Sequence, residues 1–236
     1  MQISFQLMEY PVSDQRHFAA AIFDFDETIV DLERQHTRTA EELCRLQGSE
    51  YASFPESLRN RSGIRLSDEV GELRSYFGWT LPLEDLMRER SRIFLEEVER
   101  GSIAPMPGAV EAIRRLHAEG LRLAIASSGI RDYIEIIVAR LGVEECFREI
   151  VTGDEVRHPK PDPEAYLLAA ERLGIAPARC IAFDDSSVGV RAASAAGMFC
   201  VGMRNPRARI QQDLSAADLV VHGFGELDLD ALISRR

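Results

Sequence analysis

Lysine is almost absent from this sequence of 236 residues. Of the 28 basic residues, 27 are arginine, and the single lysine is Lys160, in the segment VRHPKPDPEAY. Among side chains, only an amine can form a Schiff base with a carbonyl substrate. Because residues 32–102 contain no lysine, Schiff-base chemistry is excluded from that large segment.

Positive charge, long apolar runs and paired cysteines are also scarce. The formal net charge of −11 argues against nucleic acid or an anionic membrane as the main partner. No run approaches the roughly 18 apolar residues of a membrane span, and the first residues lack the pattern of a signal peptide. The four cysteines form no CxxC pair, so we expect free thiols in a cytoplasmic protein. We also expect a monomer.

Short apolar segments alternate with helical patterns along most of the chain. The expected strands are 19–25, 122–128, 148–153, 180–185, 199–203 and 218–223. Apolar residues recur at helical spacing in 109–120, 132–142 and 163–174, and each of these segments ends on glycine, a common helix stop. This alternation predicts an α/β fold with a Rossmann-like, doubly wound, mainly parallel sheet covered on both faces.

A segment of helical character interrupts this alternation directly after the first strand. We expect an α/β core formed by 1–31 and 103–236, a helical cap formed by 32–102, and a linker over 101–108. Ligands of open α/β sheets bind beyond the carboxyl ends of the strands. The cap would therefore lie over the site as a lid.

Two of the expected strands end in a pair of carboxylates. Asp24 and Asp26 follow the first strand two residues apart and so point the same way in an extended chain. Asp184 and Asp185 end a later strand. Polar strand ends are common, but neighbouring strands lie only about 4.8 Å apart, so both pairs could share one hard cation such as Mg²⁺.

Residues suited to an anion follow two further strands. Ser127 and Ser128 lead into a helix whose N-terminus would expose backbone amides, and Lys160 follows a fourth strand. Acidic metal ligands, a hydroxyl beside helix-terminal amides and a lysine together indicate a site that handles phosphate.

In these motifs the chain resembles the haloacid dehalogenase-like phosphohydrolase superfamily, in particular its β-phosphoglucomutase-like branch, which has a helical cap after the first motif. The resemblance covers residues 20 to about 225. The four motifs occur in order, at Asp24-x-Asp26-x-Thr28, at Ser127, at Lys160 followed by Pro161 and Pro163, and at Asp184 with Asp185.

The resemblance implies a role for each motif residue. Asp24 would be the nucleophile that forms an aspartyl-phosphate, and Asp26 the general acid and then the general base. Ser127 and Lys160 would hold the phosphoryl oxygens. The implied Mg²⁺ ligands are Asp24, the backbone carbonyl of Asp26 and the second acidic pair, in which Asp185 is the more direct ligand and Asp184 lies beside it.

Five further residues are candidates for binding phosphate or substrate: Thr28, Ser128, Gly129, His36 and Arg65. Each has an ordinary alternative. Thr28 could only cap a turn, and Ser128 could be a neighbour of the motif serine. His36 and Arg65, in the cap, could be solvated or engaged in surface ion pairs.

Three positions depart from the pattern of the family. Glu27 stands where relatives usually have glycine, Leu32 where many have serine or threonine, and Pro159 where many have glycine. The first places a bulky charge at the entry to the cap, and the second removes a hydroxyl from the hinge.

The sequence favours a Mg²⁺-dependent phosphatase acting on a small-molecule phosphate ester, such as a sugar phosphate. The alternative is a sugar-phosphate mutase, whose relatives use a basic cap residue; Arg88, Arg90 or Arg92 could supply it. A catalytically silent binding module is the alternative from another class. The absence of lysine from the cap excludes a phosphonate-cleaving relative, and Asp26 with the second acidic pair argues against a dehalogenase.

Overall fold

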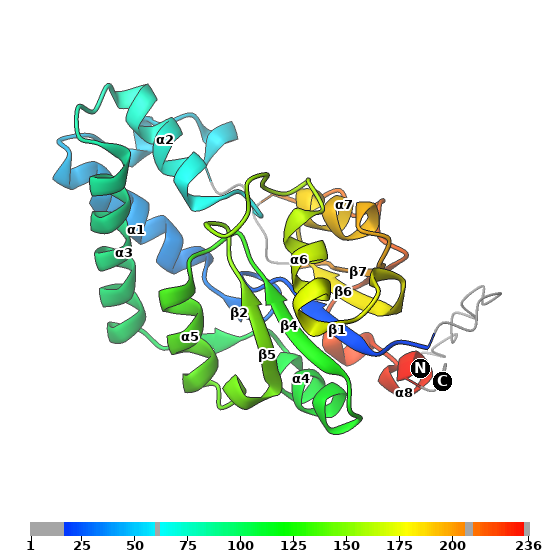
Figure 1. Cartoon of the computed structure of the whole chain (residues 1–236). Coiled ribbons are helices and arrows are strands. Elements are labelled where there is room, and N and C mark those ends of the chain that lie inside the picture. Colours follow the sequence, from blue (N-terminus) through cyan, green and yellow to red (C-terminus); the bar gives the residue numbers. More distant parts are fainter. Residues whose placement is uncertain (1–16, 60–61, 206–209, 234–236) are drawn as a thin grey trace, which may run out of the picture.

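A six-stranded parallel sheet forms the centre of the computed structural model, which describes residues 17–59, 62–205 and 210–233 (Figure 1). The strand order is β5-β4-β1-β6-β7-β8. The strands are β1 (Ala20–Phe23), β4 (Arg122–Ala126), β5 (Phe147–Val151), β6 (Cys180–Asp184), β7 (Phe199–Met203) and β8 (Leu219–Val221). Every neighbouring pair is parallel. The predicted fold class is confirmed.

Helices cover both faces of the sheet. Successive strand residues point to opposite sides, and because both sets are apolar, each face must be buried against helices. Ala21 and Phe23 of β1 face one hydrophobic cluster, with α4 (Ala109–Ala118), α5 (Arg131–Arg140) and α8 (Leu229–Ile233). Ala20 and Ile22 face the other, with α6 (Glu164–Leu173) and α7 (Ser187–Ala195). Short 3₁₀ helices lie at Tyr51–Ser53, Glu56–Leu58, Glu144–Cys146, Pro177–Arg179 and Phe224–Glu226.

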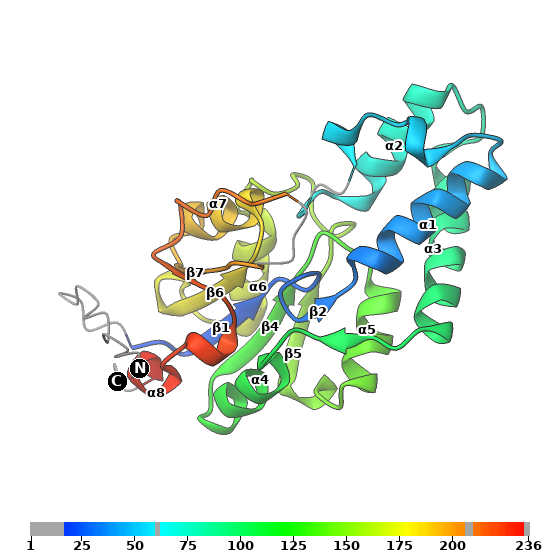
Figure 2. The ribbon, with the colours of Figure 1, turned by 180° about the vertical axis from the view of Figure 1, so that it is seen from behind.

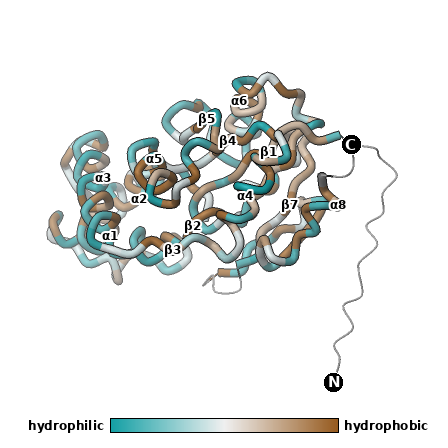
Figure 3. Tube along the Cα trace, turned by 90° about the horizontal axis from the view of Figure 1, so that it is seen from below, coloured by the Kyte–Doolittle hydropathy of each residue, from teal (hydrophilic) through white to brown (hydrophobic). Residues whose placement is uncertain are grey.

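The cap segment lies apart from the sheet and has its own hydrophobic cluster. It contains α1 (Glu33–Leu46), α2 (Leu66–Phe77) and α3 (Leu83–Arg100), and α1 packs beside α3 in both views (Figures 1 and 2). Hydrophilic and hydrophobic stretches alternate along α1 and α3 in Figure 3, as expected for helices that bury one face. The division into core and cap remains our proposal.

A two-stranded ribbon joins the cap to the sheet. β2 (Val30–Asp31) pairs antiparallel with β3 (Ala104–Pro105). The segment 101–108, expected as a linker back to the core, contains β3, because strands of two residues are too short to give a periodic signal.

The carboxyl ends of β1, β4 and β6 lie next to one another, since β1 pairs with β4 on one side and with β6 on the other. Residues that directly follow these strands therefore meet at one edge of the sheet. Within the described residues, no helix combines the length and the hydropathy needed to cross a membrane.

Candidate active site

Lys160 lies between two buried carboxylates. Its ammonium donates to Oδ1 of Asp24 and to Oδ2 of Asp184, each at 2.7 Å, and its side chain is only 1% exposed. Burial by itself lowers the pKa of Lys160, but Asp184 and Asp24 together outweigh burial and raise the pKa above its ordinary value. The lysine is therefore a fixed positive charge beside Asp24.

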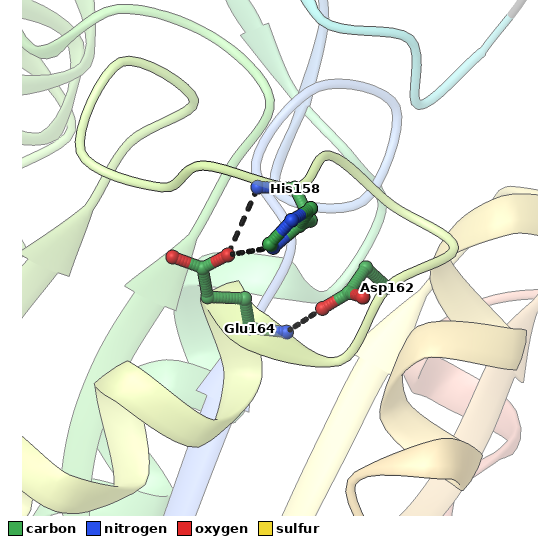
Figure 4. Close-up of side chains that lie close together, drawn as sticks. All are labelled: His158, Asp162 and Glu164. Carbon is green, nitrogen blue, oxygen red and sulfur yellow. Dashed lines mark hydrogen bonds and ion pairs between the residues drawn. The ribbon is translucent and has the colours of Figure 1, made fainter.

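The loop that presents Lys160 is held by the side chain of Glu164. Its carboxylate accepts from the backbone amide of Arg157 at 2.9 Å. It also accepts from the backbone amide of His158 and pairs with the His158 ring, both at 2.9 Å (Figure 4). Asp162 accepts from the Glu164 amide at 3.0 Å. His158, Asp162 and Glu164 lie close enough to share a cation, but these contacts already explain their proximity as a loop scaffold.

Asp24, Asp184 and Asp185 form an acidic cluster at the strand ends; the side chain of Asp26, which the sequence grouped with Asp24, is not part of it. All three are buried, and each offers an oxygen within 4.8 Å of the others. Burial, then Asp184, raises the pKa of Asp185 well above its usual range. Burial likewise raises the pKa of Asp24, even though Lys160 opposes it. Three crowded carboxylates facing one ammonium fit a further hard cation such as Mg²⁺.

The two acids of the second pair differ in their hydrogen bonds. Oδ2 of Asp184 accepts from Lys160 and from the Tyr166 hydroxyl, and Oδ1 accepts from the amide and hydroxyl of Ser186. Among the described residues, Asp185 accepts two longer hydrogen bonds, from Thr28 at 3.3 Å and from Ser62 at 3.0 Å. Asp185 is thus freer to bind a metal, whereas Asp184 is well placed to hold Lys160.

Asp26 contacts a different set of side chains. Its Oδ2 accepts from the Tyr133 hydroxyl at 2.8 Å, and the Nε2 atom of His36 lies 3.5 Å from it. Within the described part of the chain, the buried Oδ1 has no hydrogen-bond partner. Burial and the nearby charge of Asp26 raise the pKa of Tyr133 well above its ordinary value, so its hydroxyl stays a donor.

His36 faces the site rather than solvent. Its ring stacks on Phe94 with the centroids 4.6 Å apart. The guanidinium of Arg90, which is 2% exposed, lies 3.0 Å from Nδ1 and 3.5 Å from Glu69. Because a guanidinium can only donate, Nδ1 of His36 is the acceptor and Nε2 carries the proton towards Asp26.

Of the three cap arginines that the sequence marked for a mutase role, Arg90 contacts a residue that lines the pocket, His36. Arg88 and Arg92 are exposed, and they pair on the surface with Asp85, Glu89 and Glu96. The sequence marked all three arginines alike, because exposure is not visible from residue type.

The turn after β4 contains the serine motif. Ser127 is buried and accepts from the Gly129 amide at 3.0 Å. Ser128 instead donates to the carbonyl of Gly63 in the cap at 2.8 Å. A Cβ atom at Gly129 would overlap the Tyr133 hydroxyl, so glycine is required there by close packing.

The cap segment around Gly63 closes against the core. Ser62 donates to Asp185, and the Arg65 guanidinium donates to the backbone carbonyl of Val156 at 3.0 Å. A Cβ at Gly63 would lie 2.5 Å from the Ser186 hydroxyl. Arg65 thus links cap and core, and its contact with a substrate stays a prediction.

Glu27 and Leu32, two departures from the family pattern, are connected. Glu27 has a φ of 62°, a region that favours glycine. Its carboxylate accepts from the amides of Leu32 and Glu33 at 2.9 Å and from Asn205 at 2.9 Å. Leu32 is the residue before α1, and its side chain cannot accept a hydrogen bond from the first amides of the helix. The Glu27 carboxylate acts as the N-terminal cap instead. Burial, then Asp31, raises the pKa of Glu27 to about 7.

A pocket lies between the cap and the sheet edge. It brings together Asp26, Asp185 and His36 with residues that sequence reasoning had not named as site residues. These are Glu27, Glu33, Leu58, Ser62, Gly63, Ile64, Leu66, Glu69, Ile210 and Gln212. Glu27 could have been suspected from the missing glycine. Ser62 and Glu69 carry no local signal.

The comparisons with known proteins agree with this geometry. The model of the haloacid dehalogenase-like hydrolases matches residues 18–197. The chain is 32% identical to the fructose-1-phosphate phosphatase YqaB of Escherichia coli (strain K12), over 79% of this chain and 97% of the relative. Two further curated relatives are also named as phosphatases.

Solved structures share the fold. CbbY from Rhodobacter sphaeroides, in complex with phosphate, superposes with a TM-score of 0.79 at 28% identity, covering 89% of this chain and 96% of that one. β-Phosphoglucomutase from Clostridium difficile superposes with a TM-score of 0.77 at 22% identity, covering 92% and 96%. The chain is thus a hydrolase that belongs to the haloacid dehalogenase-like family, and it shares its fold with β-phosphoglucomutase.

Proposed function

We propose that this enzyme is a Mg²⁺-dependent phosphatase that hydrolyses a small phosphorylated metabolite, such as a sugar phosphate, through an aspartyl-phosphate on Asp24. One observation carries the proposal: the ammonium of Lys160 lies 2.7 Å from Asp24, within a buried cluster of three carboxylates. A carboxylate nucleophile can approach an anionic phosphate only where positive charge offsets their repulsion.

Asp24 attacks phosphorus, and Lys160 holds the attacking carboxylate and a phosphoryl oxygen in place. Ser127, which is buried at the adjacent strand end, donates its hydroxyl to a second phosphoryl oxygen. Asp24, Asp185 and the carbonyl of Asp26 would hold Mg²⁺. When bound, Mg²⁺ would neutralise charge on the transferring phosphoryl group.

Asp26 serves as acid and then as base. As the bond between Asp24 and phosphorus forms, the bond to the leaving oxygen breaks, and Asp26 gives that oxygen its proton. In the second step Asp26 takes a proton from the attacking water. The bond between the water oxygen and phosphorus forms as the bond between Asp24 and phosphorus breaks. This step releases inorganic phosphate and regenerates the Asp24 carboxylate.

The test is hydrolysis of p-nitrophenyl phosphate by the wild type and by Asp24→Asn, each with Mg²⁺ and with EDTA, followed by a panel of phosphorylated metabolites. We expect Mg²⁺-dependent release of phosphate that Asp24→Asn abolishes, and a trapped phosphoryl adduct on Asp24 by mass spectrometry. Turnover that persists in Asp24→Asn would contradict the proposal. An isomerised sugar phosphate formed only with a bisphosphate activator would replace it with the mutase.

A further inference from the structure

The two oxygens of the Asp26 carboxylate have different surroundings. Oδ2 receives the Tyr133 hydroxyl at 2.8 Å and lies 3.5 Å from His36 Nε2. Oδ1 is buried and, among the described residues, has no hydrogen-bond partner. Because Asp26 also lines the pocket between cap and core, Oδ1 is the oxygen left to meet a bound molecule.

The Tyr133 hydroxyl is held rigidly on the core side. Its side chain is buried on α5, and its ring lies 4.8 Å from Phe94 and 6.0 Å from Phe25, measured between centroids. The hydroxyl packs directly on Gly129, where a Cβ would overlap it. Tyr133 is therefore supported from the strand end, from the turn after β4 and from the cap.

We propose that Tyr133 is a positioning residue that fixes the Asp26 carboxylate, so that Oδ1 is the atom that exchanges the proton with the leaving-group oxygen. The inference rests on the proposed function, in which Asp26 is the acid and base. A carboxylate turns easily about its last bond, and among the residues that the structure describes the only other partner of Oδ2 is His36, at the longer distance of 3.5 Å. Without the hydroxyl, the acid loses its orientation towards the leaving oxygen.

This role predicts a dependence on the leaving group. An alkoxide needs a proton as it departs, whereas p-nitrophenolate is stable enough to leave without one. The value of kcat/KM covers only the steps up to departure of the leaving group, so later hydrolysis of the aspartyl-phosphate does not affect it. Misplacement of a catalytic group by about 1 Å can lower a rate by about 100-fold.

The experiment compares kcat/KM of the wild type and Tyr133→Phe on a series of substituted phenyl phosphates of increasing leaving-group basicity, together with glycerol 2-phosphate. We expect kcat/KM of Tyr133→Phe to fall by about 10- to 100-fold for the most basic leaving groups. It should fall by less than about threefold for p-nitrophenyl phosphate. The slope against leaving-group basicity therefore becomes steeper.

Tyr166→Phe is the matched control. Tyr166 is equally buried and donates its hydroxyl to a carboxylate, that of Asp184, at 2.7 Å. Tyr166 acts on the Lys160 side of the site, so loss of its hydroxyl should lower kcat/KM by the same factor for all substrates. If Tyr133→Phe also lowered kcat/KM by the same factor for all substrates, the role of Tyr133 would be purely structural and the inference would be overturned.

A second variant covers a failure of Tyr133→Phe to fold. In Gly129→Ala the added methyl displaces the Tyr133 hydroxyl and also lies 3.1 Å from the Ser127 hydroxyl. The value of kcat/KM should therefore fall for every substrate, and the same steeper slope is still expected. An unchanged slope in a folded Gly129→Ala would also overturn the inference. A wild type without Mg²⁺-dependent turnover would instead refute the proposed function.

Discussion

Replacing Lys160 by methionine tests whether one ammonium holds the acidic centre together. The substitution keeps a long unbranched side chain and removes the charge. Asp184 keeps its bonds from Tyr166 and Ser186, so most of the effect should fall on Asp24, which loses a bond of 2.7 Å inside the protein. Removing one partner of a buried ion pair costs about 3–5 kcal/mol.

The size of this loss should depend on pH. Burial already raises the pKa of Asp24, and without the ammonium the pKa rises further. A raised pKa in the folded state means that stability is present at low pH and is lost as the pH rises through that pKa. Lys160→Met should therefore be destabilised more at pH 8 than at pH 5, because protonation removes the uncompensated charge.

Urea unfolding in EDTA at both pH values measures the effect. Lys160→Arg is the control: it keeps the charge but must fit a larger group beside the Tyr166 ring, 5.0 Å from the ammonium. Overpacking costs about 1–3 kcal/mol and should not vary with pH, and the Arg variant should lose most activity because the planar guanidinium cannot take the same position. A Met variant with the wild-type midpoint at pH 8 would refute the reasoning.

Three further changes test the cap hinge, the cap contact and the metal site. Because burial raises the folded-state pKa of Glu27, the wild type should lose up to about 3 kcal/mol of stability as the pH rises from 4.5 to about 7. Glu27→Gln should not show this loss. Urea unfolding in EDTA at several pH values measures it, and an equal loss in both proteins would contradict the reasoning. Gly63→Ala should raise KM about tenfold, since its Cβ would meet Ser186 at 2.5 Å and Val188 at 2.6 Å; steady-state kinetics with unchanged KM would argue against closure by this contact. Mg²⁺ at about 100 times its Kd should stabilise the wild type by about 2.7 kcal/mol, or about 5–10 °C in melting temperature; Asp185→Asn should lose most of that rise, and an equal rise would exclude Asp185 as a ligand.

The departures at Glu27 and Leu32 show where reading the sequence alone stops. The sequence marked both as unusual, a bulky charge at the entry to the cap and a hydroxyl missing from the hinge. In the structure the Glu27 carboxylate accepts the amides at the start of α1, which Leu32 cannot cap. The two departures therefore compensate each other, and the link depends on the left-handed backbone at Glu27.

The sequence by itself determined the sheet, the order of the motifs and the residues at the strand ends. Helix and strand periods, glycine stops and polar strand ends are local signals, and parallel strands bring their carboxyl ends to one edge. Asp24, Lys160 and Asp185 could be grouped on that basis.

Only the tertiary structure decided which side chains from distant parts of the chain meet. Tyr133 contacts Asp26 across 107 positions of the chain, and Ser62 contacts Asp185 across 123. The sequence does not distinguish Arg90 from its exposed neighbours Arg88 and Arg92; Arg90 is buried because of how α3 packs against α1. Such contacts depend on how helices and strands pack in three dimensions, and this packing leaves no periodic pattern in the residues that it brings together.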